Sequence, residues 1–244
     1  MKGMLTIRAQ RKLTSRVVEL TCYGELVKKM TEPGQFIHIR IDRGEDLVLR
    51  RPISICDVDI EKEELTLVYR IEGKGTARLA AKKSGETLDL LGPLGRGFPL
   101  DEAKKGETAL IVGGGVGVPP LYYLSKQLIK RDVRVVHVLG FQSERDVFYE
   151  EKFRELGDTF IATVDGTKGT KGFVTDVIEK ERFDFDVLYS CGPIPMLRAL
   201  SEKYQNRRAY ISLEERMACG IGACFACVCH ADRDVKKAYR KICT

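Results

Sequence analysis

The sequence predicts an α/β plus β fold, in which a small antiparallel β-barrel precedes a doubly wound parallel sheet and a short cysteine-rich tail. Three observations support this order. Short alternating strands fill the chain to about residue 100, compact apolar runs with helices between them follow from about residue 107, and four cysteines fall within eleven residues near the end. A chain of 244 residues has room for two domains of ordinary size. We expect segments at residues 1–100, 101–213 and 214–244.

The first hundred residues alternate apolar and polar side chains, as half-buried strands do. Five such segments lie at residues 4–10, 16–22, 35–41, 64–70 and 86–92. Short strands at this spacing are typical of a small antiparallel barrel. One helix interrupts them: we expect Thr76 to cap it, residues 77–83 to form it and Gly85 to end it.

From about residue 107 the period of the apolar residues changes. Runs rich in Val and Ile lie at residues 109–114, 133–140, 159–165, 185–192 and 209–213. Helix-like segments separate them at residues 120–130, 145–156, 173–181 and 193–204. A β-α unit repeated four times and followed by a closing strand predicts a parallel, doubly wound sheet.

Two loops of this sheet are candidates for binding a nucleotide, because each joins a strand end to a helix start. The first contains Gly113, Gly114, Gly115 and Gly117 before two prolines, and the second contains Cys191, Gly192 and Pro193. Glycines let a backbone approach a pyrophosphate, and a helix N-terminus favours its charge. The alternatives are a tight turn without a ligand and, for the cysteine, a small buried residue. The loop departs from G-x-G-x-x-G and no acid ends the next strand, which disfavours a standard Rossmann dehydrogenase.

The barrel segment carries its own candidates for a ligand with a diphosphate and a flat ring. Arg51, followed by Pro52, Ile53 and Ser54, or Arg70 could pair with phosphate, and the amides of Gly75 and Thr76 could cradle it. Tyr69 could stack on a ring. Taken singly, each is better explained as a surface arginine or a barrel-wall tyrosine, and only their combination favours a ligand.

The cysteines of the tail are the most specific signal. Cys219, Cys224 and Cys227 have the C-x4-C-x2-C spacing of plant-type [2Fe–2S] ligation, and Cys243 follows. The competing interpretations are structural zinc with Cys229 as the fourth ligand, and an excess of buried cysteines. Zinc favours paired knuckles set apart, so we favour iron–sulfur over zinc.

Composition limits the class of protein. The net charge is +6, with 41 basic and 35 acidic residues, and bases are not interleaved with aromatics as in nucleic-acid binders. The densest basic stretch, residues 234–241, could face an acidic partner. No uninterrupted apolar run is long enough to span a bilayer, and no secretion signal is evident. We therefore expect a cytoplasmic protein without nucleic-acid or membrane partners.

Several motifs occur in an order that resembles a known family. They are RPIS at residues 51–54, GKGT at 73–76, LGPLG at 91–95, GGGVGVPP at 113–120, CGP at 191–193 and SLEERMACG at 212–220. The chain resembles the ferredoxin–NADP reductase superfamily and, within it, the electron-transfer subunits of NAD-dependent (class 1B) dihydroorotate dehydrogenases. The resemblance covers nearly the whole chain.

The resemblance implies an oxidoreductase subunit with three cofactor segments. A six-stranded barrel would hold FAD through residues 51–54, Val68, Tyr69, Arg70, Gly75 and Thr76. The glycine loop and residues 191–193 would border NAD(H), and Cys219, Cys224, Cys227 and Cys243 would hold a [2Fe–2S] cluster. The partner would be an FMN-containing catalytic subunit that oxidises dihydroorotate in pyrimidine (UMP) biosynthesis, with two copies of each subunit in a heterotetramer.

The proposed chemistry is electron transfer, for which we expect no catalytic acid or base in this chain. Its three histidines, His38, His137 and His230, form no evident catalytic set. The alternatives are a reductase subunit of another complex, of hydrogenase, sulfide dehydrogenase or NADPH:ferredoxin transhydrogenase type, and a zinc-bearing interaction module. Glu144, near the end of the second sheet strand, disfavours a 2′-phosphate and so favours NAD over NADP.

Overall fold

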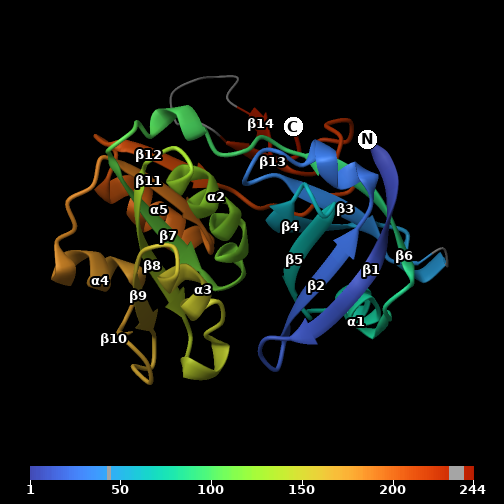
Figure 1. Cartoon of the computed structure of the whole chain (residues 1–244), viewed down its shortest axis with the longest axis horizontal. Coiled ribbons are helices and arrows are strands. Elements are labelled where there is room, and N and C mark those ends of the chain that lie inside the picture. Colours follow the sequence, from blue (N-terminus) through green and yellow to red (C-terminus); the bar gives the residue numbers. More distant parts are fainter. Residues whose placement is uncertain (43–44, 231–238) are drawn as a thin grey trace. The chain divides into compact units, whose positions relative to one another are not determined.

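The chain forms two compact units in a computed structural model that describes residues 1–42, 45–230 and 239–244 (Figure 1). The barrel unit contains residues 1–11, 18–97 and 213–244, and the sheet unit contains residues 12–17 and 98–212. A closed barrel and a sheet of parallel strands confirm the expected fold class. No helix among the described residues is both long and apolar enough to cross a membrane.

The barrel closes in the strand order β1-β2-β5-β4-β3-β6. Its strands are β1 (Lys2–Lys12), β2 (Val17–Tyr23), β3 (Phe36–Arg40), β4 (Arg51–Asp59), β5 (Glu64–Arg70) and β6 (Thr87–Leu94). The 3-10 helices η1 (Glu25–Lys29) and η2 (Glu45–Leu47) lie in its connections. Alternate residues such as Leu5, Ile7, Leu65 and Leu67 are at most 1% exposed and fill the interior.

The barrel's helix α1 (Lys74–Ala81) begins earlier than the sequence predicts. Gly73 is its N-cap, and Thr76 lies in the first turn, where its hydroxyl accepts hydrogen bonds from the amides of Glu72 (3.0 Å) and Gly73 (3.3 Å). The expected cap at Thr76 is therefore wrong by three residues, because the hydroxyl reaches back to amides before it. Gly85 follows the helix with a φ of +88°, a left-handed conformation that favours glycine.

The sheet unit has the strand order β10-β9-β8-β7-β11-β12, with all the sheet pairs parallel. The strands are β7 (Thr108–Gly114), β8 (Arg134–Phe141), β9 (Asp158–Thr163), β10 (Thr170–Lys171), β11 (Val187–Cys191) and β12 (Arg208–Ser212). The helices are α2 (Pro119–Ile129), α3 (Glu150–Arg154), α4 (Val174–Glu181) and α5 (Ile194–Lys203), with η3 (Leu100–Glu102), η4 (Gly115–Gly117) and η5 (Glu144–Asp146) between elements.

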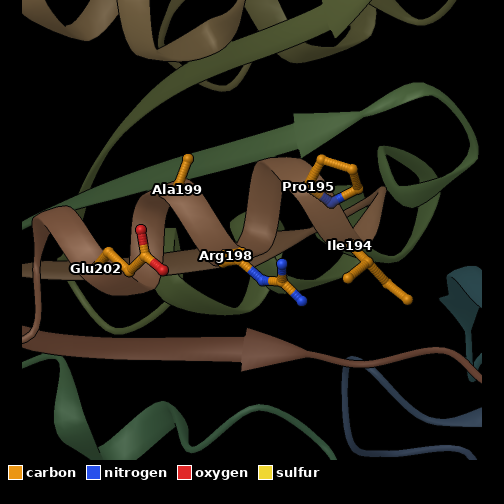
Figure 2. A pocket seen from close by; sticks show the side chains of 5 residues that line it. All are labelled: Ile194, Pro195, Arg198, Ala199 and Glu202. Carbon is orange, nitrogen blue, oxygen red and sulfur yellow. The ribbon is translucent and has the colours of Figure 1, made fainter.

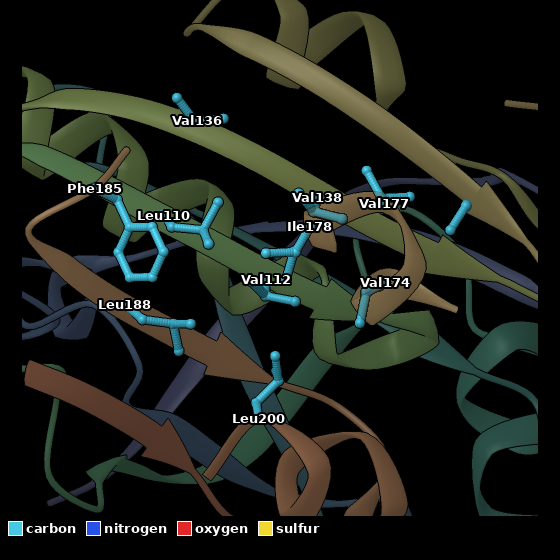
Figure 3. Packing of buried hydrophobic residues seen from close by; sticks show 11 residues of the cluster. Leu110, Val112, Val136, Val138, Val174, Val177, Ile178, Phe185, Leu188 and Leu200 are labelled. Carbon is cyan, nitrogen blue, oxygen red and sulfur yellow. The ribbon is translucent and has the colours of Figure 1, made fainter. Parts of the chain in front are cut away.

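Helices cover both faces of this sheet. On one face, alternate residues of the central strands, such as Val136 and Val138, pack against Val177 of α4 and Leu200 of α5 (Figure 3). On the other, the β8 ring of His137 contacts Phe153 of α3 at 4.9 Å between centroids. The helix α3 is much shorter than predicted, because Tyr149 before it has a φ of +64°, which no α-helix continues.

The cysteine-rich tail belongs to the barrel unit. It contains a hairpin, β13 (Val228–His230) paired antiparallel with β14 (Tyr239–Lys241), which the sequence pattern did not indicate. Cys227 and Cys243, 2% and 3% exposed, form a small core with Phe36 of β3. The tail thus packs its buried side chains against the barrel, because a segment of this length is too short to form a core of its own.

His137 is a buried histidine with both ring nitrogens in hydrogen-bond contact. Nδ1 lies 3.1 Å from Thr159 Oγ1 and Nε2 lies 3.0 Å from Ser125 Oγ. Burial lowers the pKa of His137 to about 4, so the ring is neutral at pH 7. A neutral ring has one N–H, so it donates to one of these two hydroxyl oxygens.

We predict that His137 makes the protein less stable as the pH falls from 6.5 to 4. Over this range His137 binds a proton in the unfolded chain but not in the folded chain. The free energy of unfolding therefore decreases by up to about 1.4 kcal/mol per pH unit. Urea unfolding followed by circular dichroism at pH 7, 6 and 5 measures this. His137→Gln should have a shallower pH dependence than the parent chain, and equal slopes would contradict the prediction.

Candidate functional site

The N-terminus of α1 and the start of β4 form a cationic corner in the barrel unit. A Cβ on Gly75 would lie 2.6 Å from Nε of Arg51, so the guanidinium fills the space that this glycine leaves. Arg51 also donates from Nη1 to the carbonyl of Leu49 at 2.6 Å, which fixes its direction. The first turn of α1 has free amides and no acidic residue. An arginine beside such amides fits a phosphate or diphosphate.

The remaining barrel candidates differ in the exposure and hydrogen bonding of their side chains. Ser54 is partly exposed and donates from Oγ to Glu214 at 3.4 Å. Tyr69 is 3% exposed and donates its hydroxyl to Oε1 of Gln10 at 2.8 Å, and burial raises the pKa of this phenol. Arg70 is exposed and pairs with Glu72. Because the Tyr69 ring lies in the core, a ligand at β5 would meet the strand's backbone rather than this ring.

In the sheet unit the two predicted nucleotide loops lie against each other. Cys191 at the end of β11 is in register with Gly113 of β7. A Cβ on Gly117 would overlap the carbonyl of Cys191, and one on Gly192 would lie 3.0 Å from the amide of Gly114. The structure therefore brings these candidates together at the carboxyl end of the central strands, where open α/β sheets bind ligands.

A shallow hollow of about 410 Å³ follows the second loop along α5 (Figure 2). Its lining residues are Ile194, Pro195, Arg198, Ala199 and Glu202. They repeat at three- and four-residue intervals, so they form one side of the helix. Ile194 is 54% exposed and directly follows Pro193, so this hollow begins next to the second loop.

The four predicted ligands of the tail lie near one another as two close pairs. The sulfurs of Cys227 and Cys243 lie 3.2 Å apart, and the Cys224 thiol forms a side-chain hydrogen bond with Cys219. Among the residues that the structure describes, no three Cys, His, Asp or Glu side chains are already arranged as a metal site. Cys229, the alternative ligand, lies on β13 opposite Arg240.

Backbone amides point at two of these sulfurs. Ile221 donates to Sγ of Cys219 at 3.5 Å and Gly222 donates to Sγ of Cys243 at 3.2 Å. The first hydrogen bond, with the neighbouring Cys224 thiol, lowers the pKa of Cys219 to about 6, whereas burial raises that of Cys243 to about 11. Thiolates directed by amide donors are the ligands that an iron–sulfur cluster requires, so the residues present fit this group.

Two residues near the cysteines have positions that the sequence did not indicate. Lys241, which the sequence assigns to a basic stretch, donates from Nζ to the carbonyl of Gly222 at 2.6 Å and lies over the Phe225 ring at 3.8 Å. His38 is fully buried beneath Gly220, and no spacing in the sequence links the two. The side chain of His230 and residues 234–238 of the basic stretch lie outside the described residues.

Comparison with known proteins defines first the class and then the family. A family model described as an oxidoreductase NAD-binding domain matches residues 111–202, and one described as the iron-sulfur cluster binding domain of dihydroorotate dehydrogenase B matches residues 214–244. The chain is thus an NAD-dependent oxidoreductase component with an iron–sulfur segment. It belongs to the family of electron transfer subunits of dihydroorotate dehydrogenase B (NAD(+)), as the sequence motifs predict.

Relatives of that name are similar along the whole chain. The Bacillus cereus (strain B4264) subunit is 61% identical over 100% of this chain and 94% of the relative, and the Shouchella clausii (strain KSM-K16) subunit is 60% identical over the same shares. A solved structure of NADH-dependent reduced ferredoxin-NADP oxidoreductase is 28% identical with a TM-score of 0.86, covering 99% of this chain and 86% of that one. The cytochrome b5 reductase domain of Ulva prolifera nitrate reductase, 17% identical over 86% and 97% with a TM-score of 0.70, shares the fold.

We predict that Gly117→Ala weakens NADH binding by about tenfold, or about 1.4 kcal/mol, because the added Cβ pushes the first loop away from the Cys191 carbonyl. Titration calorimetry with NADH measures the change. Gly106→Ala is the control, since Gly106 has a φ of +83°, lies outside the loop and has open space around it. Wild-type affinity in Gly117→Ala would show that the two loops do not need this close approach.

Proposed function

We propose that this chain carries electrons between NAD(H) and a dihydroorotate-oxidising catalytic subunit in pyrimidine biosynthesis, by way of FAD and a [2Fe–2S] cluster. The observation that carries the proposal is the tail, where paired cysteines receive amide hydrogen bonds at Cys219 and Cys243. Identity of 61% to named electron transfer subunits supports the same role.

We assign each cofactor to residues within one unit. FAD is held by residues 1–100, through Arg51, Pro52, Ile53, Ser54, Val68, Tyr69, Arg70, Gly75 and Thr76. NAD(H) is held by residues 101–213, through Gly113, Gly114, Gly115, Gly117, Cys191, Gly192 and Pro193. The cluster is held by residues 214–244, through Cys219, Cys224, Cys227 and Cys243.

The chain's own contribution is to bind and orient these groups. Arg51 and the first amides of α1 neutralise a diphosphate, and the tight contact of Gly117 with Cys191 shapes the nucleotide loop. The amides of Ile221 and Gly222 stabilise the negative charge on the cysteine sulfurs. When bound, FAD supplies two-electron exchange with NAD(H) and one-electron exchange with the cluster. We assign no proton-transferring side chain.

The name of the family implies a catalytic partner subunit. We propose further that this partner contains FMN, that two copies of each subunit assemble, and that the complex is cytoplasmic. A second candidate is a reductase subunit serving a different acceptor, which the 28% identity to a ferredoxin-NADP oxidoreductase favours.

The decisive experiment is an absorption spectrum of anaerobically purified protein before and after addition of NADH. Flavin bands with an iron–sulfur shoulder, both bleached by NADH, support the proposal. Reoxidation by orotate only when the catalytic subunit is added distinguishes this role from that of a reductase with another acceptor. A chain that stays colourless after reconstitution with FAD, iron and sulfide, or that binds zinc alone, would refute the proposal.

We predict that Arg51→Ala weakens FAD binding by about ten- to hundredfold, because a hydrogen bond to a charged group contributes about 1.5–3 kcal/mol. Fluorescence titration of the FAD-free chain measures the dissociation constant. Arg8→Ala is the matched control, since Arg8 lies on β1 of the same barrel and pairs with Glu64. Equal weakening in both variants would point to a general loss of barrel stability and against a phosphate role for Arg51.

A further inference from the structure

His38 lies on β3 with its side chain fully buried beneath the cysteine-bearing tail. A Cβ on Gly220 would overlap Nδ1 of His38 and would lie 3.2 Å from Cε1 and 3.3 Å from Cγ. Gly220 itself has a φ of +70°, in the left-handed region that favours glycine. The ring therefore occupies the space that this glycine leaves and supports the turn from below.

The polarity of this ring is unexplained by packing alone. Neither Nδ1 nor Nε2 of His38 has a well-formed hydrogen bond within the described residues, although the backbone of Arg50 and of Cys219 faces the ring. A buried polar group without a well-formed hydrogen bond destabilises the fold, so an apolar side chain of similar size would be more stable here. His137, the other buried histidine that the structure describes, has both nitrogens in hydrogen-bond contact.

The backbone on either side of this contact is fixed. Arg50 donates from Nη1 to the carbonyl of His38 at 3.3 Å and from Nη2 to Oδ1 of Asp89 at 2.7 Å, which holds this part of β3 against β6. On the other side, Gly220 directly precedes the two residues whose amides donate to the sulfurs of Cys219 and Cys243. A shift of Gly220 would move both donors.

We propose that His38 is a positioning residue for the iron–sulfur site. Its ring holds the turn at Gly220 so that the amides of Ile221 and Gly222 stay directed at the cysteine sulfurs, and a ring N–H directed at this turn is a hydrogen-bond donor to it once the cluster is bound. The inference deepens the proposed function and rests on the cluster being present. Hydrogen bonds to cluster sulfurs raise the reduction potential, so losing them should lower it.

The test compares the holoprotein with His38→Leu and His38→Gln, and uses His137→Gln as a control for loss of a buried histidine elsewhere. Redox titration followed by electron paramagnetic resonance gives the midpoint potential of the cluster. We expect His38→Leu to shift it to a more negative value, by about a tenfold change in the reduced-to-oxidised ratio, or about 59 mV. His38→Gln, which keeps a donor, should shift it less, and His137→Gln should not shift it. An unchanged potential in His38→Leu would overturn the proposal.

A second measurement covers a variant that fails to incorporate the cluster. Hydrogen exchange of the metal-free full chain should show the amides of Ile221 and Gly222 exchanging about tenfold faster in His38→Leu than in the parent. Gly220→Ala should do the same, whereas Gly85→Ala, with a φ of +88° and open space, should not. Unchanged exchange in His38→Leu and Gly220→Ala would refute the positioning role of His38. A parent chain that never binds a cluster would refute the proposed function instead, so the two failures are distinguishable.

Discussion

Packing of Cys227 and Cys243 against Phe36 connects the final segment of the chain to the barrel, and the proposed cluster site depends on it. In the described part of residues 213–244, the two hairpin strands have three residues each and few apolar side chains are buried, which is too little for a separate core. The two thiols that provide this packing are also predicted ligands. The same side chains therefore serve stability and chemistry, and loss of a bound metal group would loosen the contact that holds the segment in place.

Three glycines leave space that a functional neighbour fills. Arg51 occupies the space beside Gly75, the carbonyl of Cys191 lies against Gly117, and the ring of His38 lies beneath Gly220. In each place the absent side chain permits a contact closer than any other residue would allow. The candidate sites are thus shaped by close backbone approach more than by charged side chains, which suits a protein whose role is to hold cofactors in place.

The sequence predicts five of the six barrel strands, the parallel sheet and the cysteine segment because local period and spacing determine them. Strand β4 (Arg51–Asp59) is not among the predicted segments. Other features depend on contacts between distant residues. The hairpin pairs residues 228–230 with residues 239–241, and the ring of His38 meets Gly220 across 182 positions of sequence. The shortening of α3 follows from a single left-handed residue, Tyr149, which no propensity indicates. The sequence indicates Tyr69 either as a ring that stacks on a ligand or as a barrel-wall tyrosine, and in the structure its buried hydroxyl donates to Gln10.

The two buried histidines that the structure describes differ in their hydrogen bonding and not in their burial, and this difference separates a structural histidine from one with a proposed role at the cluster site. Burial lowers the pKa of both rings, so both are neutral at pH 7. Around His137 the hydroxyls of Ser125 and Thr159 complete the ring's contacts, and its presence is explained within the sheet unit. Around His38 no such hydroxyl is present among the described residues, and the backbone of Arg50 and of Cys219 faces the ring. A native protein rarely leaves a buried nitrogen without a well-formed hydrogen bond, so such a nitrogen beside the cysteine-bearing turn supports a role for the His38 ring at that turn.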